Sequence, residues 1–239
     1  MKADLHIHTV LSPCGDIEMT PANIVRRALE MGLGIIGITD HNSTLHTKEV
    51  RRIGEREGIF VMCGAEITTK EEVHVLAFVD GDEAIDKLQM FISENIAKIA
   101  NDPDFFGYQL VVNENEEVVY EEDNLLISAI NKSIDEVGEF VHSLGGIFIP
   151  AHIDKSQNSL LSQLGFIPPH LMVDALEVSP ICNFGDFMTK NSYLSKYKFI
   201  RSSDAHYLPD VGRVFTELDI EKPSFDLVRE AIKILVIDE

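Results

Sequence analysis

Runs of consecutive apolar residues alternate along this chain with segments whose apolar residues recur every three or four positions. The runs "LGIIGITDH" at 33–41 and "IFVMCGAEIT" at 59–68 stay apolar almost to their ends, which is typical of strands buried on both faces. Between them, "TPANIVRRALEMG" places Thr20 before a helical repeat and Gly32 after it. The pattern therefore predicts a strand, a helix and a second strand early in the chain.

The same two patterns recur through the rest of the sequence, with one short link. Only a few residues separate the strand at 59–68 from the strand at 71–80, whereas a parallel crossover needs about a dozen or more. We therefore expect these two strands to pair antiparallel or to form a local excursion. We predict strands at 1–8, 33–41, 59–68, 71–80, 147–154, 173–179, 198–206 and 213–220, and helices at 20–32, 45–58, 82–100, 133–146, 183–197 and 224–235.

Repeated strand–helix alternation indicates an α/β architecture in which helices cover a largely parallel sheet. Residues 81–140 depart from this alternation, because a helix is followed there by two short strands around the acidic turn "NENEE". We predict one domain over 1–239, with 81–140 as a small inserted cap segment. About seven strands remain as candidates for a barrel, and they end near His8, Asp40, Glu66, Phe78, His152, Ser179 and Asp204.

The charge and the cysteines narrow the expected partners and compartment. The chain carries 40 acidic against 20 basic residues, so its formal net charge is −20 and its pI is near 4.7. Such a field repels polyanions, so we expect no stable nucleic-acid binding. The three cysteines show no paired spacing, and neither a signal peptide nor an apolar run of ~18 residues is visible. We therefore expect a cytoplasmic protein without membrane contact.

Histidines and carboxylates gather where the predicted strands end. In α/β barrels these ends converge on the active site, and residues i and i+2 of a strand share a face. Adjacent residues in "TDHN" cannot both face inward, so one of them is expected to support a turn. Six of the nine histidines belong to the candidate set, which is His6, His8, His41, Glu66, His74, His152, Asp204 and His206.

Imidazoles combined with carboxylates form a ligand set for Zn, Mn or Fe rather than for Ca or Mg. One ion takes three or four protein ligands, so this set implies two or three divalent ions. Taken singly, each motif has an ordinary alternative: "HIH" on a strand is often incidental, and "SSDAH" is compatible with a turn. Taken together, so many polar groups at one sheet edge are costly to bury without ions, which favours a metal cluster.

In this order, "DLHIHT", "TDHN", "GAEI", "PAHID" and "SDAH" resemble the motifs of the PHP (polymerase and histidinol phosphatase) superfamily, and they extend over residues 4–206. The resemblance implies a distorted (β/α)7 TIM-like barrel, which agrees with the strand count. It also implies a metal-dependent phosphoesterase that acts on a small phosphorylated substrate. The implied ligands are His6, His8, Glu66 and Asp204 for one ion, Glu66, His74 and His152 for a second, and His41 and His206 for a third.

The turn after the first motif departs from that superfamily's pattern. Relatives with three ions often place a histidine there, whereas this chain has "LSPCGD", which offers Cys14 or Asp16 as the remaining ligand. A thiolate would favour zinc. The alternative is that Cys14 is a small residue in a tight Pro–Gly turn and binds no ion.

The resemblance and the cluster both imply that a hydroxide held between ions hydrolyses a phosphoester. Glu66 and Asp204 are then catalytic because they hold the ions, while Lys155 and Arg213 are candidate cations for the phosphate. Two other functions stay open: a non-phosphate metallohydrolase of the amidohydrolase type, and a catalytically silent metal-binding regulatory module. The three remaining histidines are expected to be structural, namely His46, His142 and His170.

Overall fold

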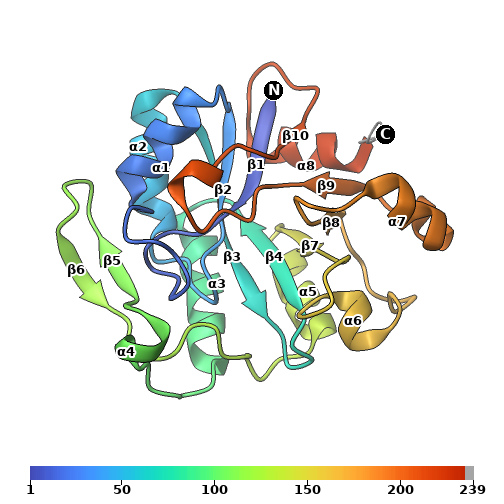
Figure 1. Cartoon of the computed structure of the whole chain (residues 1–239), viewed down its shortest axis with the longest axis horizontal. Coiled ribbons are helices and arrows are strands. Elements are labelled where there is room, and N and C mark those ends of the chain that lie inside the picture. Colours follow the sequence, from blue (N-terminus) through green and yellow to red (C-terminus); the bar gives the residue numbers. More distant parts are fainter. Residues whose placement is uncertain (235–239) are drawn as a thin grey trace.

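A computed structural model describes residues 1–234, and a curled six-stranded sheet forms the centre of the fold (Figure 1). Its strands lie in the order β10-β1-β2-β3-β4-β7. Their bounds are Lys2–Ile7 for β1, Ile35–Ile38 for β2, Phe60–Thr68 for β3, His74–Val79 for β4, Ile147–Pro150 for β7 and Thr216–Glu217 for β10.

Strand direction explains which residues reach one end of this sheet. Strands β1, β2 and β3 are parallel, whereas β4 is antiparallel to both β3 and β7. The antiparallel pairing expected across the short link after 59–68 is therefore confirmed. It places His74, the first residue of β4, opposite Thr68 near the end of β3. Strand β4 ends at Val79, close to the predicted end near Phe78, but its antiparallel direction brings His74, and not this end, beside the ends of the neighbouring strands.

The mixed α/β architecture is confirmed, but the sheet does not close into a complete (β/α)7 barrel within residues 1–234. Strands β8 (Leu176–Val178) and β9 (Phe199–Arg201) form a separate two-stranded sheet. They contact the main sheet near the strand ends: Ile153 N, after β7, donates to Glu177 O in β8 at 2.8 Å, and Ile7 of β1 bridges Ala205, after β9. Strand β10 occupies the edge of β1 that a closing strand would need, so the prediction of a full barrel is wrong in this respect.

Six longer helices flank these strands: α1 (Pro21–Glu30), α2 (Thr47–Glu57), α3 (Asp82–Asn95), α5 (Ile134–Ser143), α7 (Phe184–Lys190) and α8 (Phe225–Ile234). The hydroxyl of Thr20 accepts from Asn23 N, so this residue caps α1 as its sequence predicts. In Figure 1, α1 and α2 lie beside β1 and β2. In the part of the chain that the structure describes, no helix is long and apolar enough to cross a membrane.

Several boundaries differ from the sequence prediction. The helix predicted at 82–100 ends at Asn95, because Ile96 is extended and bridges Ile130. The helix predicted at 183–197 breaks into α7 and a 3-10 helix, η1 (Ser192–Lys196). Leu235, the end of the last predicted helix, lies outside the described residues. Three short helices were not predicted: α4 (Pro103–Phe106), α6 (Leu160–Leu164) and the 3-10 helix η2 (Leu208–Asp210).

The segment 81–140 combines a covering helix with a projecting hairpin. Helix α3 contacts β3 and β4, whereas β5 (Leu110–Val112) and β6 (Val118–Glu121) pair with each other away from the main sheet (Figure 1). All four residues of β6 are exposed. That this segment caps a site, and that the chain is one domain, stay predictions.

The hydrophobic residues form two cores on the two faces of the sheet. The outer core lies between the strands and the covering helices and contains Ile36, Cys63 and Val75. The inner core contains the alternate residues of the same strands, together with residues of α8: Leu5, Ile35, Met62, Leu76, Phe78, Phe225 and Val228. On β3 and β4 the regular alternation then places Glu66 and His74 on the inner side, beyond the inner core.

Strand β1 reaches the same arrangement only through a β-bulge. Asp4 pairs with Ile36 and Ile7 with Ile38, so β1 uses two residues where β2 uses only Gly37. Leu5 belongs to the inner core, but Ile7 belongs to the outer core, although a regular strand would place both on one face. The extra residue therefore turns His6 and His8 inward in place of Ile7.

The bulge depends on a close approach at Gly37, where a Cβ atom would lie 2.5 Å from the carbonyl oxygen of Leu5. We expect Gly37→Ala to lower the free energy of unfolding by about 1–3 kcal/mol, measured by urea denaturation. Gly185→Ala is the matched control, because its Cβ would meet nothing nearer than 3.8 Å and the change favours helix by up to ~1 kcal/mol. Equal losses in both variants would contradict this explanation.

Candidate metal centre

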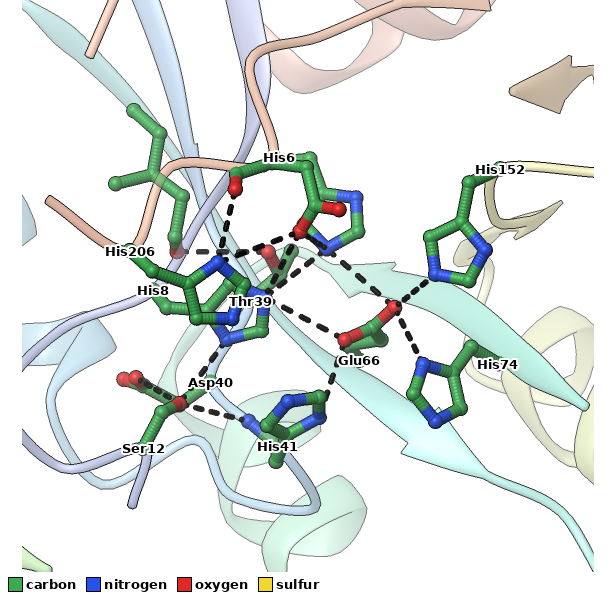
Figure 2. Close-up of polar contacts among 12 residues, drawn as sticks. His6, His8, Ser12, Thr39, Asp40, His41, Glu66, His74, His152 and His206 are labelled. Atoms are coloured by element: carbon green, nitrogen blue, oxygen red, sulfur yellow. Dashed lines mark hydrogen bonds and ion pairs between the residues drawn. The ribbon is translucent and has the colours of Figure 1, made fainter. Parts of the chain in front are cut away.

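Five imidazoles surround the buried carboxylate of Glu66 at the end of β3 (Figure 2). Its Oε1 atom lies 3.0 Å from His74 Nδ1 and 3.1 Å from His152 Nε2. Its Oε2 atom lies 3.1 Å from His41 Nδ1. The remaining two rings present Nε2 at 3.4 Å from this carboxylate, and they belong to His6 and His8. One carboxylate therefore connects ligands from four strands or strand ends.

His6 and His8 place two ring nitrogens against each other. Nδ1–H of His6 donates to Glu177 Oε2 at 2.9 Å. The Ser12 hydroxyl donates to Asp40 at 2.8 Å, so its oxygen is free to accept Nδ1–H of His8 at 3.0 Å. Both Nε2 atoms are then left as bare lone pairs only 3.1 Å apart. A positive charge, either a proton or a metal ion, must lie between them, so these residues fit a bound divalent cation.

Asp204 and His206 complete this side of the cluster from the loop after β9. Asp204 Oδ1 lies 3.4 Å from His6 Nε2 and 3.5 Å from His8 Nε2. The His206 ring stacks on that of His8, with centroids 4.1 Å apart. Asp204 has a left-handed backbone, with φ of 50°, which turns its carboxylate toward these rings.

Of the two candidate ligands in the turn after β1, only Cys14 faces the histidines. Although burial opposes ionisation, the neighbouring rings of His206 and His41 lower the pKa of Cys14 to about 6. Asp16 instead accepts from Glu18 N at 2.9 Å, so its carboxylate caps the turn. Among residues 1–234, three sets of side chains have ligand atoms close enough together to hold an ion: His8, His41 and His206; His6, His8 and Glu66; and His41, Glu66 and His74.

Charges within the cluster are strongly coupled. Burial would raise the pKa of Glu66, but the rings of His74, His6 and His41 hold it well below its usual range. Burial would lower the pKa of His6, but the carboxylates of Glu177, Glu66 and Asp204 raise it well above its usual range. The metal-free protein therefore holds protons on rings that face ionised carboxylates, and a cation would displace those protons.

Asp40 supports the loop after β1 and does not face the rings. Its carboxylate accepts from Thr9 N at 2.7 Å and from the Thr9 hydroxyl at 2.8 Å. Thr9 Oγ1 lies 2.5 Å from Nδ1 of His46, whose Nε2 accepts from Val112 N at 2.8 Å. Because Nε2 accepts, Nδ1 carries the proton and donates to Thr9. This buried chain fixes the site loop against β5.

The two cationic side chains predicted to bind phosphate, Lys155 and Arg213, lie in different surroundings. Lys155 Nζ lies 2.5 Å from Asp204 Oδ2, and its side chain remains 39% exposed at the edge of the cluster. Arg213 is 69% exposed, pairs with Asp210 at 2.7 Å, and makes no contact with the cluster among the described residues. The other histidines lie elsewhere, since His142 pairs with Asp174 and His170 with Asp135.

The sequence analysis missed Glu177, which is buried on β8 and contacts two of the histidines. A signal was present, because a glutamate in the apolar segment "DALEVS" stands two residues before a predicted strand end. Ser12 and Thr9 carried no such signal, since hydroxyl residues in a turn are common.

Comparison with protein families gives two matches that together cover most of the chain. A family model described as "PHP domain" matches residues 4–161, and one described as "PHP-associated" matches residues 195–234. The first match contains the candidate ligands from His6 to His152, and the second contains Asp204 and His206.

The similar proteins include three that are described as nucleases. The 5'-3' exoribonuclease Rnm of Salmonella typhimurium is 38% identical over 78 residues, which are 32% of this chain and 26% of that protein. The lesion-specific endonuclease PfuEndoQ from Pyrococcus furiosus has a similar fold, with a TM-score of 0.71, 19% identity, and coverage of 97% of this chain and 55% of that one. An Endonuclease Q complex with a 27-mer duplex carrying an abasic lesion gives a TM-score of 0.69, 18% identity, and coverage of 97% and 56%.

The matches with curated relatives span between 25% and 53% of the relatives' own length. The likeness to the solved structures, at these identities, shows a shared fold.

The coupled charges predict how the metal-free protein responds to pH. Burial opposes protonation of His41, but Glu66 and Cys14 raise its pKa from 6.5 to about 10. A raised folded pKa stabilises the fold fully below pH 6.5, and this contribution is lost as the pH rises toward about 10. We therefore expect the unfolding temperature in chelator to fall across this window, measured by circular dichroism.

Protein loaded with divalent ions is the control, because an ion takes the place of the proton and should flatten the pH dependence. His41→Gln should flatten it too in the metal-free protein. A metal-free protein whose unfolding temperature rises between pH 6.5 and pH 10 would show that His41 is not held protonated.

Proposed function

The chain belongs to the PHP family, whose members are metal-dependent hydrolases, and from this premise we propose that it is a metal-dependent nuclease. It would hydrolyse phosphodiester bonds of a nucleic acid. The observation that carries this proposal is the convergence of five imidazoles on Glu66, with the facing lone pairs of His6 and His8. Such a donor set fits transition-metal ions, which are suited to phosphoester hydrolysis.

We assign the ligands to two or three divalent ions, with Zn, Mn or Fe as candidates. The first ion would bind His6, His8, Glu66 and Asp204, and the second Glu66, His74 and His152. The third would bind His41, His206 and Cys14, since Cys14 rather than Asp16 lies against these rings. When bound, such ions acidify water and offset the negative charge of a phosphate in the transition state.

The chain's own residues then orient and neutralise the substrate. Glu66 and Asp204 stay ionised, because neighbouring rings hold the pKa of each carboxyl well below its usual range against the effect of burial. Lys155 lies beside Asp204 with part of its side chain exposed, so its ammonium group can bind a non-bridging phosphate oxygen. Exposed and paired with Asp210, Arg213 receives no role in this proposal.

The comparisons overturn the prediction of a small phosphorylated substrate without stable nucleic-acid binding. The similar proteins include an exoribonuclease and an endonuclease with duplex DNA at its active site. The prediction of no nucleic-acid binding failed because a net charge of −20 is a sum over the whole surface, whereas a nucleic-acid strand would contact only one face of the protein. At that face, bound divalent ions and Lys155 would supply the positive charge.

A panel of substrates tests the proposal directly. We expect purified protein to contain Zn, Mn or Fe, and to cleave RNA or DNA oligonucleotides faster than small phosphate monoesters. The panel contains 5'-phosphorylated single strands, a duplex with an abasic lesion, and nucleoside monophosphates. Chelation should abolish turnover, and Glu66→Gln should lower kcat/KM on the order of 10²–10³-fold.

Glu217→Gln is the matched control, because this exposed glutamate on β10 lies opposite Lys2 in the sheet, at the other end of β1 from the histidines. It should cleave at the wild-type rate. Full activity after removal of the ions, or turnover of monoesters alone, would contradict a metal-dependent nuclease.

Substitution of Cys14 tests the third ion separately. A thiolate ligand gives Co²⁺ a charge-transfer absorption in the near ultraviolet, which an oxygen ligand lacks. We therefore expect Cys14→Ser to lose this absorption and to bind fewer ions per chain. Asp16→Asn should keep both, since its amide oxygen can still accept from Glu18 N. A wild-type protein without this absorption, together with fewer bound ions in Asp16→Asn, would identify Asp16 as the ligand.

A further inference from the structure

Glu177 occupies an unusual position for a charged side chain. It lies in the middle of β8 between Leu176 and Val178, two residues of the outer core, and only 2% of it is exposed. Its own side chain points to the other face of the strand, toward the histidines. An ionisable group is expensive to bury in this way unless it has specific partners.

Those partners are two histidines that we assign to different ions. Oε2 of Glu177 accepts Nδ1–H of His6 at 2.9 Å and the backbone N–H of His152 at 3.1 Å. The carbonyl oxygen of Glu177 also accepts from Ile153 N at 2.8 Å. One residue of β8 therefore hydrogen-bonds both to a ring on β1 and to the backbone just after β7.

His152 needs this support because its backbone is strained. Its φ is 31°, in the left-handed region that residues with a Cβ rarely adopt. On β7 the inner core takes Ile147, Ile149 and Ala151, so regular alternation would turn His152 outward. The left-handed turn instead brings its Nε2 within 3.1 Å of Glu66. The bond from His152 N to Glu177 holds the backbone in this turn.

We propose that Glu177 is a positioning residue that sets a ligand of the first ion and a ligand of the second ion at once. This inference rests on the proposed ligand assignment of the metal centre. Through His6 it fixes the tautomer, so that Nε2 faces Glu66, Asp204 and His8. Through the backbone of His152 it fixes the direction of a ring. Ser12 makes a similar pair of contacts on the other side of the cluster, since its hydroxyl oxygen accepts from the ring of His8 at 3.0 Å and from His41 N at 3.1 Å.

Two substitutions separate the hydrogen bonds of Glu177 from its charge. Glu177→Gln keeps an oxygen that can accept from His6 and His152 but removes the negative charge. Glu177→Leu removes both, with little change in size. Glu217→Gln, at an exposed site on β10, repeats the first change away from the histidines.

Zinc affinity, measured by competition with a chromophoric chelator, is the main readout, and it needs no substrate. We expect Glu177→Gln to weaken zinc binding by about tenfold and Glu177→Leu by about a hundredfold, with an effect on more than one ion. Glu217→Gln should bind zinc like the wild type. Imidazole NMR of the zinc-loaded protein should show Nδ1–H on His6 retained in the Gln variant and disturbed in the Leu variant.

If Glu177→Leu does not fold, Glu177→Gln decides alone. Wild-type zinc affinity in either folded variant would overturn the proposal, as would loss of only one ion in the Leu variant. A protein whose zinc affinity depends on Glu177 but which cleaves no nucleic acid would reject the proposed nuclease function and leave this inference standing.

Discussion

The negative charge of Glu66, buried among imidazoles, is the constraint on which the rest of the site depends. A carboxylate at this depth is stable only with positive charge beside it, and the chain places five rings around it to meet that need. The rings can supply this positive charge by binding protons or by coordinating cations. Protonation and metal binding are therefore alternative ways of satisfying one buried group, and pH governs the competition between them.

The fold serves this constraint by bringing several strand ends to one place. Part of it could be predicted from the sequence, because Glu66 and His74 follow the regular alternation of β3 and β4 beyond their core residues. The short link before β4 correctly indicated an antiparallel neighbour. The other positions break the alternation: a bulge turns His6 and His8, and left-handed backbones turn His152 and Asp204. Hydrophobic periodicity carries no information about such local deviations, so the ordered motifs had to supply those residues.

Whether the sheet closes into a barrel could not be predicted from the sequence either. Strands β8 and β9 have three residues each, and their link to β1 passes through the residues that follow them. Apolar segments can reveal that strands exist, but not whether their ladders are continuous. The prediction about nucleic-acid binding from the net charge was also wrong, because net charge sums over all faces of the molecule. The acidic hairpin of β5 and β6 contributes to that sum, whereas bound ions and Lys155 would supply positive charge at the cluster itself.

The bulge in β1 has a consequence for how such a site is gained or lost in evolution. Deleting the single codon for Leu5 would leave Asp4, His6 and Ile7 opposite Ile36, Gly37 and Ile38, so β1 would become a regular strand and both histidines would still point inward. A regular strand that kept Leu5 would instead turn Ile7 inward and both histidines toward the helices. The bulge therefore lets β1 absorb a one-residue insertion before the histidines without loss of the site, whereas a regular strand would lose both imidazoles together.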